Sequence, residues 1–176
     1  NASIDASASV GLSFYPGAKI GIVGFTRGFH GRTLASQQAG GMAGQKAWIV
    51  NEDPAIINAP FPDGYWTTDL SFDTFLKTIA DRGLTADNIA GVIIESYQGV
   101  GPDFAPVEYV QKLRAWCDAH NVVLTFDEVQ AGFGRTGSLF GSRLWGVAPD
   151  IMVFAKGINS GYVPLGATMF NARIEQ

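Results

Sequence analysis

The sequence predicts an α/β fold in which a mostly parallel central sheet is flanked by helices. Short apolar runs rich in β-branched residues alternate with longer stretches of helical period, a pattern typical of strands joined by crossover helices. Several runs are apolar throughout, so both faces would be buried, as parallel strands require. With 176 residues, the chain suffices for one domain with a sizeable core and is too short for two ordinary domains.

The predicted strands are short runs of apolar residues. They are expected over residues 19–25, 47–51, 90–95, 122–127, 151–155 and 165–170. Between the second and third runs, residues 58–68 are rich in proline, aromatic residues and aspartate. We expect this segment to form an ordered loop.

Two helices are predicted between the strands. The clearer one covers about residues 106–120, with proline tolerated in its first turn. Its apolar residues recur at three- and four-residue steps, as Val107, Val110, Leu113 and Cys117. The second helix is expected over residues 72–80, with Ser71 or Asp69 as its N-cap.

Composition argues against several classes of partner. The net charge is −4, so the chain offers no cationic field for a nucleic-acid backbone. A single cysteine, Cys117, cannot build a thiolate metal site, and His30 and His120 are too few for most transition-metal cages, so no metal is expected. No apolar run is long enough to span a membrane, and no secretory leader is visible. We expect a cytoplasmic protein that does not bind membranes.

The two ends suggest a piece of a longer protein. The first ten residues are mostly small, with no initiator methionine, and Gln176 follows directly after a predicted strand. Charged residues make up 16% of the chain, against about 25% in typical soluble domains. That deficit indicates surface covered by a missing part or partner.

An acid and an amine are predicted to meet at one edge of the sheet. Asp127 ends an apolar strand, and Lys156 follows the next predicted strand along the chain. The carboxyl edge of an open α/β sheet is where ligands bind. Burial there would lower the pKa of the lysine for Schiff-base chemistry, and an aspartate can keep a pyridoxal ring nitrogen protonated. The alternative is an ordinary surface lysine and an aspartate that caps a turn.

A longer set of motifs resembles the class III aminotransferases of the pyridoxal-phosphate fold-type I superfamily. The matching text lies at residues 29–33 (FHGRT), 95–99 (ESYQG), 126–137 (FDEVQAGFGRTG), 145–150 (WGVAPD), 154–157 (FAKG) and 160–167 (SGYVPLGA). The resemblance covers essentially the whole chain. It implies that residues 1–176 form one partial large domain, which binds the cofactor. The family's N-terminal segment and C-terminal small domain would be absent.

The resemblance assigns roles around a bound pyridoxal 5'-phosphate. Lys156 would form the Schiff base and shuttle the α-proton as general acid and base. Asp127 would pair with the pyridine nitrogen, and Gln130 would hydrogen-bond the ring's phenolic oxygen. Val129 and Phe29 would press on the two ring faces, which excludes water and fixes the ring tilt.

Further residues complete the expected cofactor site. The resemblance places the phosphate at Ala2 and Ser3, where backbone amides at a helix N-terminus favour an anion. This pair departs from the family pattern, because alanine replaces glycine and Ile4 replaces an acidic residue. His30 is expected to make a local hydrogen bond. Glu95 matches the family's first glutamate in its segment and would support the residues that touch the cofactor.

Two positions bear on the substrate. Arg32 matches the residue that grips a substrate carboxylate in relatives acting on α-amino acids, and its alternative role is a structural ion pair. Val100 occupies the position of a second glutamate, which in some family members pairs with a mobile arginine to switch between two substrates. The sequence therefore predicts that this switch is missing.

Residues 132–137 also satisfy the pattern G-x-G-x-x-G, which can mark a dinucleotide site. The first glycine lies several residues beyond the predicted strand, Arg135 crowds the phosphate turn, and no strand-ending acid follows at the expected distance. We therefore expect a loop without a dinucleotide. The sequence contains neither a phosphate-loop motif nor a nucleophile elbow.

The resemblance implies a pyridoxal-phosphate-dependent aminotransferase that moves an amino group between an amino acid or amine and a 2-oxo acid. It would be a homodimer when complete, and the chain alone is expected to be inactive. Two alternatives stay open. One is an isomerase, epimerase or lyase that uses the same Lys156 and Asp127, and the other is a non-catalytic fragment.

Overall fold

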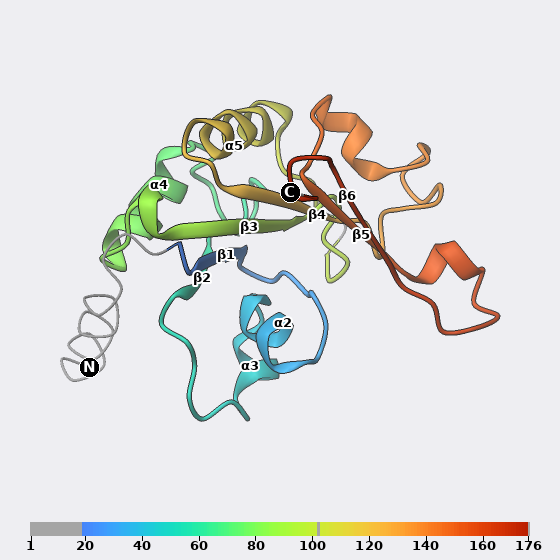
Figure 1. Cartoon of the computed structure of the whole chain (residues 1–176), viewed down its shortest axis with the longest axis horizontal. Coiled ribbons are helices and arrows are strands. Elements are labelled where there is room, and N and C mark those ends of the chain that lie inside the picture. Colours follow the sequence, from blue (N-terminus) through green and yellow to red (C-terminus); the bar gives the residue numbers. More distant parts are fainter. Residues whose placement is uncertain (1–18, 102, 176) are drawn as a thin grey trace.

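The computed structural model describes residues 19–101 and 103–175, and a six-stranded sheet forms its centre (Figure 1). The strand order is β2-β1-β3-β4-β5-β6, with every neighbouring pair parallel except β5 and β6. The bounds are β1 (Gly21–Phe25), β2 (Ile56–Ala59), β3 (Ile89–Glu95), β4 (Val123–Asp127), β5 (Ile151–Phe154) and β6 (Ala167–Phe170). The predicted α/β class with a mostly parallel sheet is confirmed.

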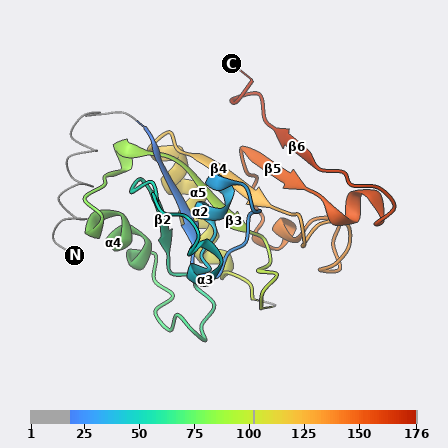
Figure 2. The same cartoon turned by 90° about the horizontal axis from the view of Figure 1, so that it is seen from below.

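Helices cover both faces of this sheet. The α-helices are α2 (Leu34–Ala39), α3 (Ala43–Lys46), α4 (Asp73–Asp81) and α5 (Val107–Ala119). Three short 3-10 segments are η1 (Ala86–Asn88), η2 (Gly141–Trp145) and η3 (Lys156–Asn159). Helices α4 and α5 lie on one face, and α2 and α3 lie on the other (Figures 1 and 2).

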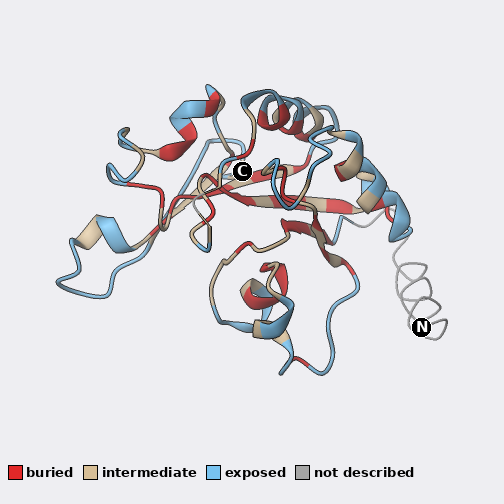
Figure 3. Cartoon of the chain, turned by 180° about the vertical axis from the view of Figure 1, so that it is seen from behind, coloured by how far each residue is buried: buried red, intermediate tan, exposed pale blue. Residues whose placement is uncertain are grey.

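The main core lies between the sheet and the pair α4 and α5. Phe75 of α4 stacks against Phe25 of β1, and Leu113 of α5 is fully buried. Phe126 of β4 meets Trp145 edge to face, with ring centroids 5.0 Å apart. Buried residues follow the central strands and the inner side of α5 (Figure 3). Because burying one such side chain is worth about 1.5–3 kcal/mol, this layer holds the strand ends in fixed relative positions.

Five of the six predicted strands are confirmed, with ends shifted by one or two residues. The strand expected over residues 47–51 is wrong, since these residues form turns after α3. Trp48 and Val50 are exposed there, at 54% and 91%. The edge of β1 is instead occupied by β2, which pairs Ile56 with Ile22 and overlaps the segment expected to be a loop.

Both predicted helices are confirmed as α4 and α5, but the N-cap of α4 is Phe72 and not the expected Ser71 or Asp69. Helices α2 and α3 were not predicted; they span only six and four residues and lack side-chain hydrogen bonds at their N-caps. Among the described residues, no helix has the length and apolar character needed to cross a membrane.

Candidate active site

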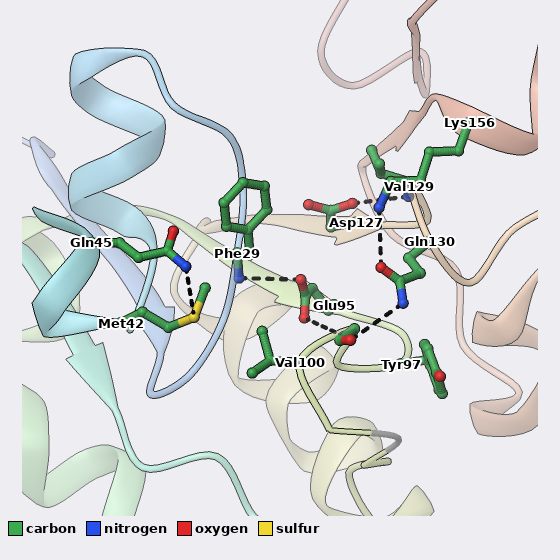
Figure 4. A pocket seen from close by; sticks show the side chains of 11 residues that line it. Phe29, Met42, Gln45, Glu95, Tyr97, Val100, Asp127, Val129, Gln130 and Lys156 are labelled. Atoms are coloured by element: carbon green, nitrogen blue, oxygen red, sulfur yellow. Dashed lines mark hydrogen bonds between the residues drawn. The ribbon is translucent and has the colours of Figure 1, made fainter. Parts of the chain in front are cut away.

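A pocket of about 250 Å³ lies where the central parallel strands end (Figure 4). Residues that follow β1, β3, β4 and β5 all contribute to it, as expected for the carboxyl edge of a parallel sheet. It is lined by Phe29, Met42, Gln45, Glu95, Tyr97, Gly99, Val100, Asp127, Val129, Gln130 and Lys156. The predicted acid and amine therefore line one cavity.

Asp127 is the last residue of β4 and is 5% exposed. Its Oδ1 atom accepts a hydrogen bond from the backbone N–H of Val129 at 2.9 Å. Its Oδ2 atom lies 2.9 Å from Nδ1 of His30, whose side chain is buried. An ionised carboxylate can only accept, so Nδ1 of His30 carries the proton. His30 thus hydrogen-bonds a residue 97 positions away in the chain, not the local partner that the sequence analysis expects, and its predicted place at the cofactor stays a prediction.

Lys156 begins η3 directly after β5 and its connecting residue. Its ammonium donates to Oε1 of Gln130 at 3.0 Å, and the Gln130 amide donates in turn to the carbonyl of Gly99 at 3.3 Å. The backbone of Lys156 is left-handed, with φ at +43°. Contrary to the sequence-based expectation of a desolvated amine, Lys156 is exposed, because it stands just past the end of β5 at the rim of the sheet.

Glu95 ends β3 and pairs in register with Asp127 on the neighbouring strand. Its Oε1 atom accepts the backbone N–H of Phe29 at 3.1 Å, and its Oε2 atom accepts that of Gly99 at 3.2 Å. Burial raises the pKa of Glu95 to about 7. The nearby imidazole of His30 opposes that rise, and the charge of Asp127 adds to it.

His30, Glu95 and Asp127 each place a potential ligand atom within 4.8 Å of the others. This grouping of metal-binding side chains was not anticipated by the sequence analysis. All four carboxylate oxygens already accept hydrogen bonds, from three backbone amides and from the imidazole. These four hydrogen bonds hold the two carboxylates in place.

Several predicted site residues converge on the pocket, and others do not. Phe29, Val129, Gln130, Asp127 and Lys156 all line it, as does Glu95. His30 reaches it through Asp127. Their assigned contacts with a cofactor remain predictions.

Arg32 is exposed and does not line the pocket. Among the ion pairs of the described residues, none involves it, so the structural ion pair weighed as its alternative role is not seen there. Its assignment to a substrate carboxylate remains a prediction. The predicted phosphate site at Ala2 and Ser3 lies outside the described residues.

Sequence reasoning missed part of the lining. Met42 and Gln45 come from the start of α3, where no motif points to a site. Tyr97 and Gly99 lie just beyond Glu95, inside a run that the family resemblance had already marked. The position of that run after a buried strand was the signal that could have identified them.

The residues fit a pyridoxal phosphate. An amine, a primary amide, a buried carboxylate and an aromatic ring converge on one cavity, through Lys156, Gln130, Asp127 and Phe29. This donor set suits a flat, electron-poor ring with an aldehyde.

Residues 132–137 form turns, and the next helical segment is the 3-10 segment η2. They do not open the α-helix that a dinucleotide fingerprint requires.

Comparisons with known proteins agree. Residues 8–176 match the family described as Aminotransferase class-III. The acetylornithine aminotransferase of Agrobacterium fabrum is 41% identical over 155 residues, covering 88% of this chain and 35% of that protein. The omega-amino acid–pyruvate aminotransferase of Pseudomonas putida is 33% identical over 173 residues, covering 90% of this chain and 37% of that protein. The chain thus spans little more than a third of the length of these relatives.

Solved structures show the same fold. An amine transaminase from an uncultivated Pseudomonas species, in its PLP-bound form, superposes with a TM-score of 0.82 at 35% identity, covering 99% of this chain and 41% of the other. An (S)-enantioselective omega-transaminase from Thermomicrobium roseum gives 0.82 at 29% identity, covering 98% and 41%. The expected cofactor and the fold-type I architecture are thereby confirmed at the level of the family. The chain belongs to the class III aminotransferases, a pyridoxal-phosphate-dependent family.

Proposed function

We propose that the protein containing this chain is an aminotransferase that moves an amino group between an amino acid or amine and a 2-oxo acid. Residues 1–176 would form the central part of its large, cofactor-binding domain. One observation carries the proposal: Lys156, Gln130 and Asp127 line a single pocket at the carboxyl edge of the sheet. An amine that attaches a carbonyl compound and a buried carboxylate that holds a cationic ring nitrogen are the two groups this chemistry needs.

The residues around the pocket would hold and orient the cofactor. Pyridoxal phosphate, when bound, supplies an electron sink for the negative charge left by removal of the donor's α-proton. Asp127 would keep the ring nitrogen protonated, and the N–H of His30 would hold the carboxylate in place. Phe29 and Val129 would exclude water from the ring faces.

Lys156 would play two parts. Its amine would attach the cofactor covalently, and once released by the substrate it would take up the α-proton and return it at a different carbon. Gln130 accepts a hydrogen bond from Nζ of Lys156 at 3.0 Å. That bond would limit where the amine can point, which favours proton transfer along one direction.

The relatives indicate the substrate class. Their names refer to acetylornithine, succinylornithine, omega-amino acids and β-alanine, with pyruvate as a named partner. We infer a donor from this range of amino acids or amines, with a 2-oxo acid such as pyruvate as the acceptor. Transfer is favoured over isomerisation, epimerisation or elimination, because these relatives are named as aminotransferases or transaminases.

We also infer that the complete protein is a homodimer. Exposed apolar side chains gather on β6 and the segment before it, where Tyr162, Val163, Leu165, Met169 and Phe170 are half or more exposed. A patch of this kind is typical of a surface that another chain or domain covers. Sedimentation analysis of the complete protein tests the oligomeric state.

The buried single cysteine, Cys117, suits a reducing compartment such as the cytoplasm.

Borohydride reduction of the cofactor-loaded complete protein, followed by peptide mapping, tests the proposed function. The pyridoxyl group is expected on Lys156, and a Lys156→Ala variant should lose it. Lys77→Ala is the matched control, because Lys77 is exposed on α4. An adduct found only on Lys19, Lys46, Lys77 or Lys112 contradicts the proposal. Transfer of a labelled amino group to pyruvate then separates an aminotransferase from an isomerase or a lyase.

A further inference from the structure

Glu95 lines the pocket between the loop that carries Phe29 and the turn that carries Gly99 (Figure 4). It is 7% exposed, although charged side chains are seldom buried without a partner. The described residues place no arginine or lysine in an ion pair with it. Its partners are instead two backbone amides. The role of Glu95 therefore depends on the two chain segments that carry these amides.

The two amides come from segments far apart in the sequence. Phe29 follows β1, and Gly99 follows β3, and each donates its N–H to a different oxygen of the Glu95 carboxylate, at 3.1 and 3.2 Å. Both segments line the pocket, the Gly99 turn together with Val100, and they are called its two walls below. A single side chain therefore joins both walls.

The Gly99 turn links Glu95 to the Gln130 side chain. The Gly99 carbonyl accepts the Gln130 amide at 3.3 Å, and the other end of that amide accepts Lys156 at 3.0 Å. A Cβ atom on residue 99 would overlap the Gln130 side chain, so only glycine lets the amide lie this close. Displacement of the Gly99 turn would therefore move Gln130 as well.

We propose that Glu95 is a positioning residue that fixes the two walls of the pocket relative to each other and, through Gly99, orients the Gln130 amide toward Lys156. Glu95 itself makes no bond to Lys156 or Gln130 among the described residues. The part of the proposal that concerns cofactor binding rests on the proposed function. The part that concerns the two walls stands on the hydrogen bonds alone.

Amide hydrogen exchange in the cofactor-free complete protein tests the link between the walls. In a Glu95→Gln variant, the side-chain oxygen can accept one N–H, while its NH₂ group faces the other. At pH 8, above the pKa of Glu95, exchange of at least one of the Phe29 and Gly99 amides should accelerate by about tenfold, the effect of one lost hydrogen bond to a charged group. Glu108→Gln is the matched control, because Glu108 is exposed on α5. Unchanged exchange at both amides overturns the proposal.

Cofactor binding tests the effect on Gln130. Glu95→Gln should weaken pyridoxal phosphate binding by about tenfold and reduce the circular dichroism induced in the cofactor's absorption band, which reports ring orientation. Gly99→Ala should reproduce the dichroism change by displacing Gln130, while the Phe29 amide stays protected by Glu95. Wild-type affinity and dichroism in both variants overturn the proposal.

A second substitution covers the case in which Glu95→Gln impairs folding, as judged by thermal unfolding. Glu95→Asp keeps the charge but shortens its reach, so it should lose one of the two amide contacts and give a smaller effect of the same kind. Wild-type exchange at both amides in this variant also overturns the proposal. If the wild-type protein forms no adduct at Lys156, the proposed function fails, and amide exchange still decides whether Glu95 joins the walls.

Discussion

Nδ1 of His30 lies 2.9 Å from Oδ2 of Asp127, and both side chains are buried at the edge of the sheet. The two residues come from different strand ends, after β1 and at the end of β4. The remaining ring nitrogen of His30 has no hydrogen-bond partner among the described residues. Among the described residues, the bond to Asp127 is thus the hydrogen bond that orients the imidazole, and Asp127 is held by His30 and the Val129 amide.

Asp127→Asn should leave the fold intact and lower amino-group transfer by about a hundredfold or more. The amide has nearly the same shape, but it carries no charge to keep a ring nitrogen protonated. Steady-state transfer rates and thermal unfolding, measured on the same preparations, check both halves. Wild-type turnover would show that the Asp127 carboxylate does not pair with the cofactor.

His30 should be replaceable only by a residue that can donate a hydrogen bond. His30→Phe removes the donor to a buried carboxylate, and a loss of about 1.5–3 kcal/mol in the free energy of unfolding is expected. His30→Asn offers an amide N–H in a similar place and should recover part of that loss. Urea unfolding of both variants provides the comparison, and equal losses would contradict a role through the hydrogen bond.

Glu95 should make stability fall as the pH rises from about 4.5 to 7. Its pKa is 4.5 in its ordinary state and about 7 in the folded protein, where burial and Asp127 raise it and His30 opposes them. In this window the folded state keeps a proton that the unfolded state has released, so raising the pH favours unfolding, by about 3 kcal/mol in total. Urea unfolding of the cofactor-free protein from pH 4.5 to 8 should show this decline in wild type relative to Glu95→Gln. The same pH dependence of the free energy of unfolding in both proteins would contradict this prediction.

Gly157→Ala should disturb the site through packing. A Cβ atom on residue 157 would lie 2.8 Å from Cβ of Phe133, directly beside the left-handed backbone of Lys156. A shift of either neighbour would displace the amine, so a loss of transfer activity of about tenfold or more is expected. Gly44→Ala is the matched control, since an added Cβ there meets no atom within 4 Å and alanine favours a helix. Equal activities in the two variants would contradict this reasoning.

Leu113→Ala should destabilise the protein by about 2–5 kcal/mol without a specific effect on the pocket. Leu113 is fully buried on α5, between the helix and the sheet. Chemical unfolding measures the loss. A change below about 1 kcal/mol would show that the core closes around the lost side chain.

The sequence predicted the parallel sheet because strands that are buried on both faces consist of nearly continuous apolar residues, as in residues 122–127. It failed at residues 47–51, where an apolar run forms turns after α3 and β2 takes the place beside β1. Asp127 and Lys156 could be placed from their strand ends. Met42 and Gln45 could not, because tertiary packing alone brings the start of α3 to the pocket.

The family motifs predicted more of the pocket residues than the positions of strand ends did. Val129 and Gln130 are specified by the motif resemblance, whereas the contacts of Glu95 with Phe29 and Gly99 join segments that only the folded chain brings together. The exposure of Lys156 was missed for the same kind of reason, since the sequence shows where a strand ends but not how far its last residue is covered.

The strand order places a topological switch point between β1 and β3. The connection that leaves β1 carries α2 and α3 over one face of the sheet, and the connection that leaves β3 carries α5 over the other (Figures 1 and 2). The loops that leave these two strands therefore diverge, and a crevice opens between them whatever residues they contain. Because its two sides belong to separate connections, residues of either side that do not contact Glu95 can be substituted without moving the other side. Substrate range could thus change on one side while the residues at the ends of β4 and β5, which would hold the cofactor, stay unchanged.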